Sequence, residues 1–510
     1  MDEKSFVLRS EAIFDGTGDV PFSGYVAVRD GEIVGVGEGD GDAFVTGGVR
    51  VIDVGDALVT PGLVDAHCFF QGWLLQNYGA DLSGCASLAE AAARVAAQEG
   101  FALRVGHGLP LALATTDTLL LDEVFGDEPC VLVCEGAEAM VMNGAAEDAF
   151  GFTPQECWSE RAHLLLAAVM ADHAASVPLY RRYLSMMNGY GVTSTKEMGY
   201  DDDWFVDEVV GLERSGELTL RVSLMSQPVG RDADIGYGLG LRDRLAKSDL
   251  VAFSGYNQMT DGSIGDHAGE MKEPYLDFDG RCSLDIDWGH HAEEVRRAEE
   301  AGFRFSLHVQ GDGAVSHALD IFEGCARDDD GRLRFRHAMT DLEAADPADF
   351  ARMAALGVVA EVYPLIQSIA SRAGKVEMIG RTIGEERGAH YWNRRGMLDA
   401  GVRVACATDL PMTLDDLGSG VYCACGGLFP EGGSPLFSQN MITPAELVRA
   451  WCAGGAFDLM LEDRVGTLEP GKRADIAVFD TNVLALDPAD ARGCSCQMTI
   501  FDGRVVHDAR

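Results

Sequence analysis

The sequence predicts an α/β protein built around a (β/α)8 barrel of the TIM type, with β-rich segments at both ends of the chain. Three observations support this prediction: short strands at each end, a repeated helix-and-strand unit in the middle, and polar residues where the repeated strands end. A chain of 510 residues with 47% hydrophobic content can bury one large barrel and an accessory domain.

Both ends of the chain are typical of short strands joined by glycine-rich turns. Near the N-terminus we expect strands at 6–8, 24–28, 32–36 and 51–54. Near the C-terminus the same pattern predicts strands at 476–479, 496–501 and 504–506. The two ends therefore share one kind of structure, which the middle of the chain lacks.

From about residue 175 onward the chain repeats an amphipathic helix, a glycine, a short apolar strand and a polar residue. The repeats are Gly191–Lys196, Gly302–His308, Gly357–Pro364 and Gly401–Asp409. The glycine fits a helix C-terminal stop, and alternating helices and strands favour parallel βαβ units. We prefer a barrel to an open doubly wound sheet because no glycine-rich phosphate fingerprint follows the first strand.

Polar side chains at the ends of these strands predict a site at the barrel mouth, since the C-terminal face of such barrels carries the reactive groups. Lys196, His308 and Asp409 end strands of the repeat, and we expect His337 to end another. Glu361 and Tyr363, at the end of a later strand, could line the pocket. These strands would bring metal-compatible side chains to one rim.

The segment Pro61–Phe70 indicates a metal-binding strand from which one ligand has been lost. Residues i and i+2 of a strand face the same side, so His67 and residue 69 would point to one site. Residue 69 is Phe, which cannot bind a metal ion. Cys68 faces the other side of the strand and is a poor substitute.

Residues 82–162 follow the barrel pattern less well. Ser87–Ala97 is typical of an alanine-rich helix opened by a serine N-cap, and Pro129–Cys134 of a strand. We expect an insertion near residues 82–162 that caps the active site, with additional packing as the alternative.

Composition excludes several classes of partner. A net charge of −42 argues against nucleic acid or an anionic membrane. The sequence has no stretch of about eighteen apolar residues and no signal-peptide pattern at its start, so we expect a cytoplasmic protein. Its thirteen cysteines include no CxxC pair, which favours reduced, mostly buried thiols over a disulfide framework.

Seven motifs in consistent order make the chain resemble the amidohydrolase superfamily. The resemblance is to its YtcJ-like group (amidohydrolase family 3), which includes N-substituted formamide deformylases. Each motif alone is weak, but together they cover nearly the whole chain. They are Pro61–His67, Asp261–Gly265, His308–Val315, Arg336–Ala338, Ala407–Pro411, Ile442–Glu446 and Gly466–Ile476.

The resemblance implies that the two chain ends fold together into a small β-sandwich. We therefore expect residues 1–60 and 462–510 to form this composite domain and residues 61–461 to form the barrel. It also implies one or two divalent metal ions at the mouth. The metal ligands would be His67, Lys196, His308, His337 and Asp409, with Lys196 acting as a bridge if it is carbamylated.

Phe69 stands where relatives carry a second histidine, so we expect one ion rather than two. The donors suit Zn²⁺ first, and also Fe²⁺ or Mn²⁺. Asp409 is the expected catalytic base, taking a proton from water and passing it to the leaving nitrogen. Asp261, His267 and Phe69 are the expected substrate-binding residues.

Each assignment has a structural alternative. His308 and His337 could be hydrogen-bonded core histidines, and Asp409 a structural cap. His67 could merely orient the site or contact the substrate. Lys196 could form a plain salt bridge to Glu197 or Asp261, because an unmodified ammonium would repel a metal ion.

The function predicted from these residues is metal-dependent hydrolysis of a non-peptide C–N bond in a small molecule, such as an amide, formamide or cyclic amide. Two alternatives stay open: a relative that binds a small molecule without turnover, and a metal-dependent isomerase or lyase on the same fold. We also expect a homodimer.

Overall fold

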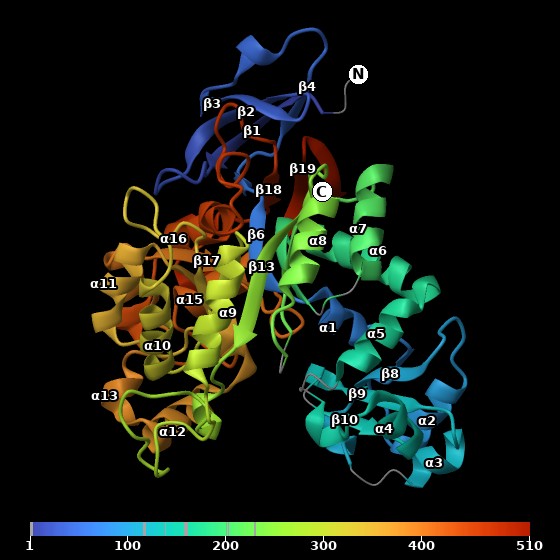
Figure 1. Ribbon diagram of the computed structural model, residues 1–510. Coiled ribbons are helices and arrows are strands. Elements are labelled where there is room, and N and C mark those ends of the chain that lie inside the picture. The colour runs from blue at the N-terminus through green and yellow to red at the C-terminus, as the bar shows by residue number, and fades with distance from the viewer. Residues whose placement is uncertain are drawn as a thin grey trace.

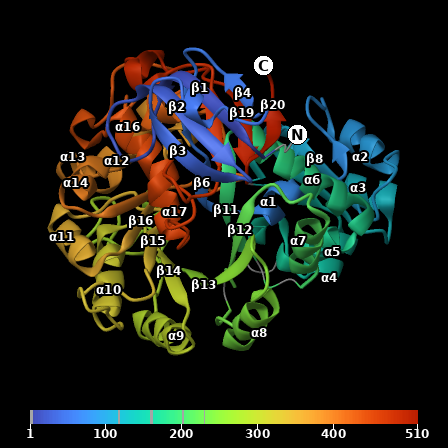
Figure 2. The same ribbon diagram turned by 90° about the horizontal axis from the view of Figure 1, so that it is seen from above.

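The computed structural model describes residues 4–115, 119–137, 139–157, 162–199, 201, 203–228 and 231–510. Eight parallel strands form a nearly closed barrel surrounded by helices (Figures 1 and 2), which confirms the predicted (β/α)8 class. In barrel order they are β6 (Leu63–Cys68), β11 (Val192–Gly199), β12 (Arg221–Ser226), β13 (Val251–Met259), β14 (Arg304–His308), β15 (Ala338–Thr340), β16 (Val359–Val362) and β17 (Arg403–Cys406).

The barrel closes where the segment after β17 meets the end of β6. The amide of Asp409 donates to the carbonyl of His67 at 2.9 Å, and the amide of Phe69 donates to that of Leu410 at 2.7 Å. Asp65 strengthens this seam, because its carboxylate accepts from the Thr408 amide at 3.0 Å and hydroxyl at 2.6 Å. The closure brings His67 and Asp409, 342 residues apart in sequence, to the same point of the rim.

Helices cover the outside of the barrel, and the predicted glycine stops are present. Gly357 ends its helix in the left-handed region at φ 72°, where a side chain would be strained. The helices of this part are α6 (His173–Gly189), α7 (Asp203–Ser215), α8 (Ile235–Leu245), α9 (Trp288–Glu300), α10 (Asp312–Glu323), α11 (Pro347–Leu356), α12 (Arg372–Thr382), α13 (Gly384–Gly388), α14 (Arg394–Asp399), α15 (Leu417–Ala424), α16 (Pro444–Arg449) and α17 (Gly455–Asp458).

Strands from both chain ends share one eight-stranded sheet, which confirms the expected composite β domain. β5 pairs antiparallel with β18, joining the two ends of the chain. A buried ion pair between Arg221 and Asp475, 2.8 Å long, ties this sheet to the barrel. The strands are β1 (Phe6–Ile13), β2 (Phe22–Arg29), β3 (Glu32–Glu38), β4 (Arg50–Asp53), β5 (Leu58–Pro61), β18 (Ile476–Phe479), β19 (Cys496–Phe501) and β20 (Arg504–Asp508). The domain limits at 60, 61, 461 and 462 stay a prediction.

The chain between β6 and β11 forms a second, four-stranded sheet with its own small core. Ser87 caps α2 as expected, its hydroxyl accepting from the Glu90 amide at 3.2 Å, and the predicted strand at 130–134 is present. This unit lies on the side to which β13 points, opposite the composite sheet (Figure 1). A capping role for it stays a prediction. Its elements are α1 (Phe70–Leu75), β7 (Ala80–Asp81), α2 (Leu88–Ala96), β8 (Arg104–Leu109), α3 (Leu119–Phe125), β9 (Cys130–Cys134), β10 (Met140–Met142), α4 (Gly144–Phe150) and α5 (His163–Ala171).

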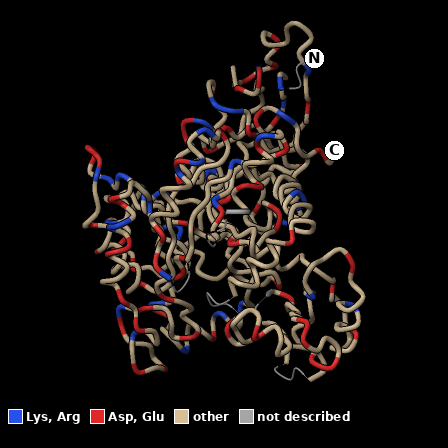
Figure 3. Tube along the Cα trace, turned by 45° about the vertical axis from the view of Figure 1, so that its right-hand side comes forward, with Lys and Arg blue, Asp and Glu red and all other residues tan. Residues whose placement is uncertain are grey.

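The surface reflects the acidic composition. Acidic positions are spread along the whole trace and outnumber the basic ones (Figure 3), in line with 82 Asp and Glu against 40 Lys and Arg. None of the described helices combines the length and apolar character needed to cross a membrane.

Candidate active site

His67 lies at the barrel mouth between two carboxylates. Its Nε2 is 3.7 Å from Oδ1 of Asp409, and its Nδ1 is 3.4 Å from Oε2 of Glu361. Glu361 can thus accept the Nδ1 proton and leave Nε2 as a donor atom toward Asp409, the arrangement usual for a metal-binding histidine. His67 is only 3% exposed, so its ring is held in place by packing.

His308, the last residue of β14, is arranged in the same way. Its Nδ1 is 2.8 Å from Oδ2 of Asp341, and Tyr363 donates its hydroxyl to that same oxygen at 3.0 Å. Its Nε2 is buried and has no hydrogen-bond partner among the described residues. A buried nitrogen left unpaired in this way is free to bind an ion or a substrate.

Asp341 was not predicted from the sequence, although its carboxylate contacts His308 and orients the ring. The motif Arg336–Ala338 ends three residues before it. The signal that could have found it is its place directly after β15, where a carboxylate would face the mouth. Its backbone adopts φ 62°, which turns the chain at that point.

The charges at the mouth shift one another's pKa values. Burial disfavours the charged form of His308, but Asp341, Asp261 and Asp409 outweigh it and raise its pKa to about 9. Burial and the charge of Asp341 raise the pKa of Asp409 to about 6. Burial opposes charge on His67, yet its contact with Glu361 and the charge of Asp409 raise its pKa. A carboxylate with a pKa near neutrality suits a general base.

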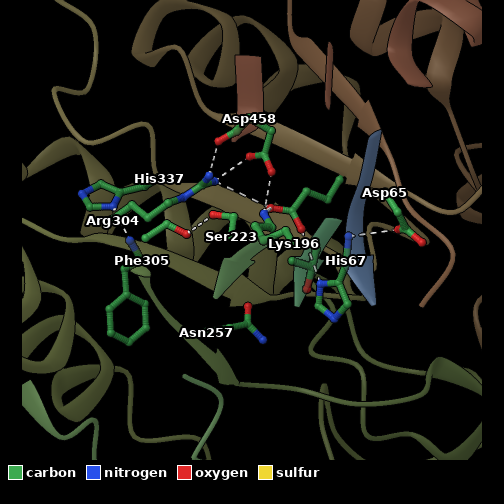
Figure 4. A network of polar contacts seen from close by, with 12 residues as sticks. Asp65, His67, Lys196, Ser223, Asn257, Arg304, Phe305, His337 and Asp458 are labelled. Carbon is green, nitrogen blue, oxygen red and sulfur yellow. Dashed lines mark hydrogen bonds and ion pairs between the residues drawn. The ribbon is translucent and has the colours of Figure 1, made fainter. Parts of the chain in front are cut away.

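Lys196 lies inside the barrel in a network of buried ion pairs (Figure 4). Its ammonium contacts Glu361 and is 2.6 Å from Oδ2 of Asp458, whose Oδ1 is 2.6 Å from Nη2 of Arg304. All four side chains are fully buried. Lys196 therefore forms salt bridges, as the alternative expected. Its partners, however, are Glu361 and Asp458 rather than Glu197 or Asp261. An ammonium held by two carboxylates offers no lone pair to a metal ion.

His337 does not end a strand, and that expectation is wrong. It stands directly before β15, where its Nδ1 accepts from the Phe305 amide at 3.0 Å and its Nε2 is 3.4 Å from Glu299. The ring also stacks on Phe322 at 5.1 Å. Figure 4 places it across the ion-pair network from His67. The structure does not bring His337 together with His308.

The expected substrate-binding residues occupy three different settings. Asp261 accepts the amides of Glu270, Gln310 and Gly311, each at 2.9 Å, and so organises the loops after β13 and β14. Nε2 of His267 forms a hydrogen bond with Oδ1 of Asp277 at 2.9 Å. The Phe69 ring lies 5.6 Å from that of His67, at the mouth. Contact of these residues with substrate stays a prediction.

A sequence model of the amidohydrolase family matches residues 50–507. The chain belongs to the amidohydrolase family. Protein LONG AFTER FAR-RED 3 of Arabidopsis thaliana is 23% identical to it over 92% of this chain and 86% of its own length. The N-substituted formamide deformylase of Arthrobacter pascens is 28% identical over 41% of this chain and 37% of its own. These matches confirm the family resemblance drawn from the motifs.

Solved structures agree with the fold. An uncharacterized metal-dependent hydrolase from Pyrococcus horikoshii matches with a TM-score of 0.75 at 19% identity, covering 96% of this chain and 100% of its own. This likeness shows the fold, and membership of the amidohydrolase family supports a hydrolase with a divalent metal ion.

The donors at the mouth of this amidohydrolase fit such an ion in type. His67 Nε2 and Asp409 Oδ1, 3.7 Å apart, can bind one ion, since two bonds of about 2.1 Å span up to about 4 Å. His308, at the end of β14, carries a further Nε2 without a hydrogen-bond partner among the described residues. In the described chain, the two sets of three metal-capable side chains whose ligand atoms lie within 4.8 Å of one another are both elsewhere, so His67, Asp409 and His308 do not form such a set.

A cavity of about 310 Å³ opens beside Asp341 and Tyr363. Its size suits a small molecule. Lys375 lines it, with its ammonium 3.6 Å from Glu343 and 5.2 Å from the ring of Trp392. Trp392 also lines it and carries a buried indole N–H without a hydrogen-bond partner in the described chain. Tyr363 lines this cavity, whereas Glu361 does not and pairs with Lys196 inside the barrel.

Proposed function

We propose that this amidohydrolase cleaves a non-peptide C–N bond, in an amide, formamide or cyclic amide, with one divalent metal ion at the barrel mouth. Zinc is our first choice, with iron or manganese as alternatives. One observation carries the proposal: His67 and His308 each have Nδ1 beside a carboxylate, which directs Nε2 to a ligand. The buried His337, in contrast, has contacts at both of its ring nitrogens.

The proposed ligands are His67, His308 and Asp409, and Asp341 and Glu361 position the two imidazoles. We leave Lys196 and His337 out of the set because each is held elsewhere by hydrogen bonds or ion pairs. Phe69 directly follows β6, its ring lies 5.6 Å from that of His67, and it offers no donor atom, which favours a single ion.

When bound, a divalent ion would polarise the substrate carbonyl and lower the pKa of a nearby water to about 7. The residues of the chain supply the proton transfers. Asp409, with a pKa raised to about 6, accepts the proton of the attacking water and delivers it to the leaving nitrogen. The Tyr363 hydroxyl and His308 hold Asp341 from two sides, so the His308 ring keeps its orientation during the reaction.

A panel of amides, N-substituted formamides and cyclic amides, followed by mass spectrometry, tests the reaction class. Hydrolysis adds the mass of water to the substrate, whereas isomerisation leaves the mass unchanged. We expect His308→Ala and Asp409→Asn to lose turnover, while the matched controls His507→Ala and Asp399→Asn keep it. Full turnover in either mouth variant contradicts the proposal.

A binding protein without turnover is the second candidate, and Phe69 is the observation that favours it. Such a protein would bind amides with a measurable Kd and release them unchanged. Product formation by the metal-loaded protein excludes this candidate, and its absence across the whole panel supports it.

We further propose a cytoplasmic, homodimeric protein. All thirteen cysteines are free and most are buried, which supports a reducing compartment. Light scattering of the purified protein tests the homodimer, with twice the mass of one chain as the expected result.

A further inference from the structure

Glu294, in the second turn of α9, has two carboxylate oxygens in different settings. Its Oε1 accepts the amide of Ala233 at 2.8 Å and the side-chain amide of Gln258 at 3.2 Å. Its Oε2 accepts no hydrogen bond from the described residues, although Glu294 is only 1% exposed. A buried carboxylate oxygen without a partner is costly, so its environment requires an explanation.

Three further donor atoms surround this oxygen. His290 Nε2 is 3.5 Å and His291 Nδ1 is 3.8 Å from Oε2, and Asp232 Oδ1 is 3.3 Å from His290 Nε2. Like Oε2, His291 Nδ1 is buried with no hydrogen-bond partner in the described part of the chain. His290 and Glu294 share a helix face because they are four residues apart.

These separations are too long for good hydrogen bonds, which join N and O at about 2.7–3.2 Å. They match instead the distance between neighbouring ligands of one ion. Two ligands bound at about 2.1 Å in a tetrahedron lie about 3.4 Å apart. A shared ion therefore explains both the unpaired Oε2 of Glu294 and the spacing of Asp232, His290 and Glu294.

We propose that Asp232, His290 and Glu294, whose ligand atoms lie within 4.8 Å of one another, form a second divalent metal site outside the barrel mouth. One imidazole and two carboxylates suit zinc in type, and the carboxylates balance its charge. His290 and Asp232 are 43% and 66% exposed, so the ion enters directly from solvent. The site shares no residue with the mouth.

The site joins two elements that flank β13. Asp232 precedes α8, whereas His290 and Glu294 belong to α9, and both helices lie at one edge of the molecule (Figure 2). Bound metal would fix the segment before α8 against α9, in addition to the Ala233–Glu294 hydrogen bond. Its role is therefore structural, because it holds Asp232 and the start of α8 against α9.

Zinc counting on the full-length protein tests the proposal. We compare wild type with His290→Gln and Asp232→Asn after equilibration with excess zinc and gel filtration. Glu294 is left intact because it also anchors Ala233. The matched control is Glu293→Gln, on the same helix, whose carboxylate pairs with Arg296 at an exposed position. We expect the two variants to lose one zinc equivalent and the control to lose none.

Two further measurements localise the ion. Anomalous scattering at the zinc edge should give a peak between α9 and Asp232 in wild type and none in His290→Gln. Zinc should also raise the Tm of wild type and Glu293→Gln more than that of His290→Gln, while His308→Ala retains this increase. Equal zinc content in wild type and His290→Gln, or a wild-type crystal without the peak, overturns the proposal.

Discussion

Replacing Lys196 by Met removes its charge while nearly keeping its volume, and so distinguishes a structural cation from a metal ligand. In wild type the buried ammonium lies between Glu361 and Asp458. In the variant, Asp458 keeps its 2.6 Å contact with Arg304. Glu361 is left with Arg304 at 3.7 Å and His67 at 3.4 Å. The main cost is therefore one buried carboxylate that has lost its closest cation.

Removing one partner of a buried ion pair costs about 3–5 kcal/mol. We expect the lower end, about 3 kcal/mol, because both carboxylates retain a cationic or imidazole neighbour. The double variant Lys196→Met, Glu361→Gln also removes the stranded charge. It should regain about 1–2 kcal/mol relative to Lys196→Met, as expected for residues in direct contact.

Urea unfolding followed by circular dichroism gives these differences, and metal analysis of the same samples gives the second readout. The exposed control Lys247→Met should stay within about 0.5 kcal/mol of wild type. The structure predicts a destabilised Lys196→Met protein with unchanged metal content at the mouth. A variant as stable as wild type that has lost its metal would refute this reasoning and restore a carbamylated, metal-binding lysine.

Three further predictions concern pH, substrate and metal number. Burial raises the pKa of Glu197 from 4.5 to about 7, so its contribution to stability is fully present below pH 4.5 and is lost as the pH rises through 7. The loss amounts to about 3 kcal/mol. Glu197→Gln should therefore show a flatter stability profile between pH 4.5 and 8 in urea unfolding, and parallel profiles would count against it. Lys375→Met should raise KM about tenfold for substrates that carry a carboxylate, with kcat unchanged, because a charge-assisted contact in the cavity is lost. An unchanged KM in steady-state kinetics contradicts a contact between Lys375 and the carboxylate of the substrate. Phe69→His adds an imidazole beside His67 and should raise the metal content above that of wild type, whereas an unchanged count means that Phe69 is not what limits the site to one ion.

The fold was predictable because its signals are local. Strand alternation at the chain ends and the glycine stops before β11, β14, β16 and β17 depend on neighbouring residues only. The position of His67, Asp409 and His308 at the mouth was also predictable, because the C-terminal ends of all barrel strands lie on the same face. Family motifs joined these local signals into one architecture.

What failed depended on contacts distant in sequence or on a single residue of register. The partners of Lys196 are Glu361 and Asp458, 165 and 262 residues away, and no local pattern pairs them. The segment Arg334–Arg336 was expected to form a strand that ends at His337, yet Arg336 adopts φ 49° and the strand begins only at Ala338. Because of this shift, His337 contacts Glu299, and Asp341, directly after β15, is the residue that contacts His308 at the mouth.

Anomalous scattering from crystals grown with zinc tests the central claim most directly, because it locates the ion at the barrel mouth without relying on a known substrate. We predict one peak there, about 2.0–2.2 Å from His67 Nε2, His308 Nε2 and an Asp409 oxygen, with Lys196 unmodified between its two carboxylates. A mouth without a peak in catalytically active, zinc-loaded protein, or a peak bonded to Lys196 or His337, contradicts this account.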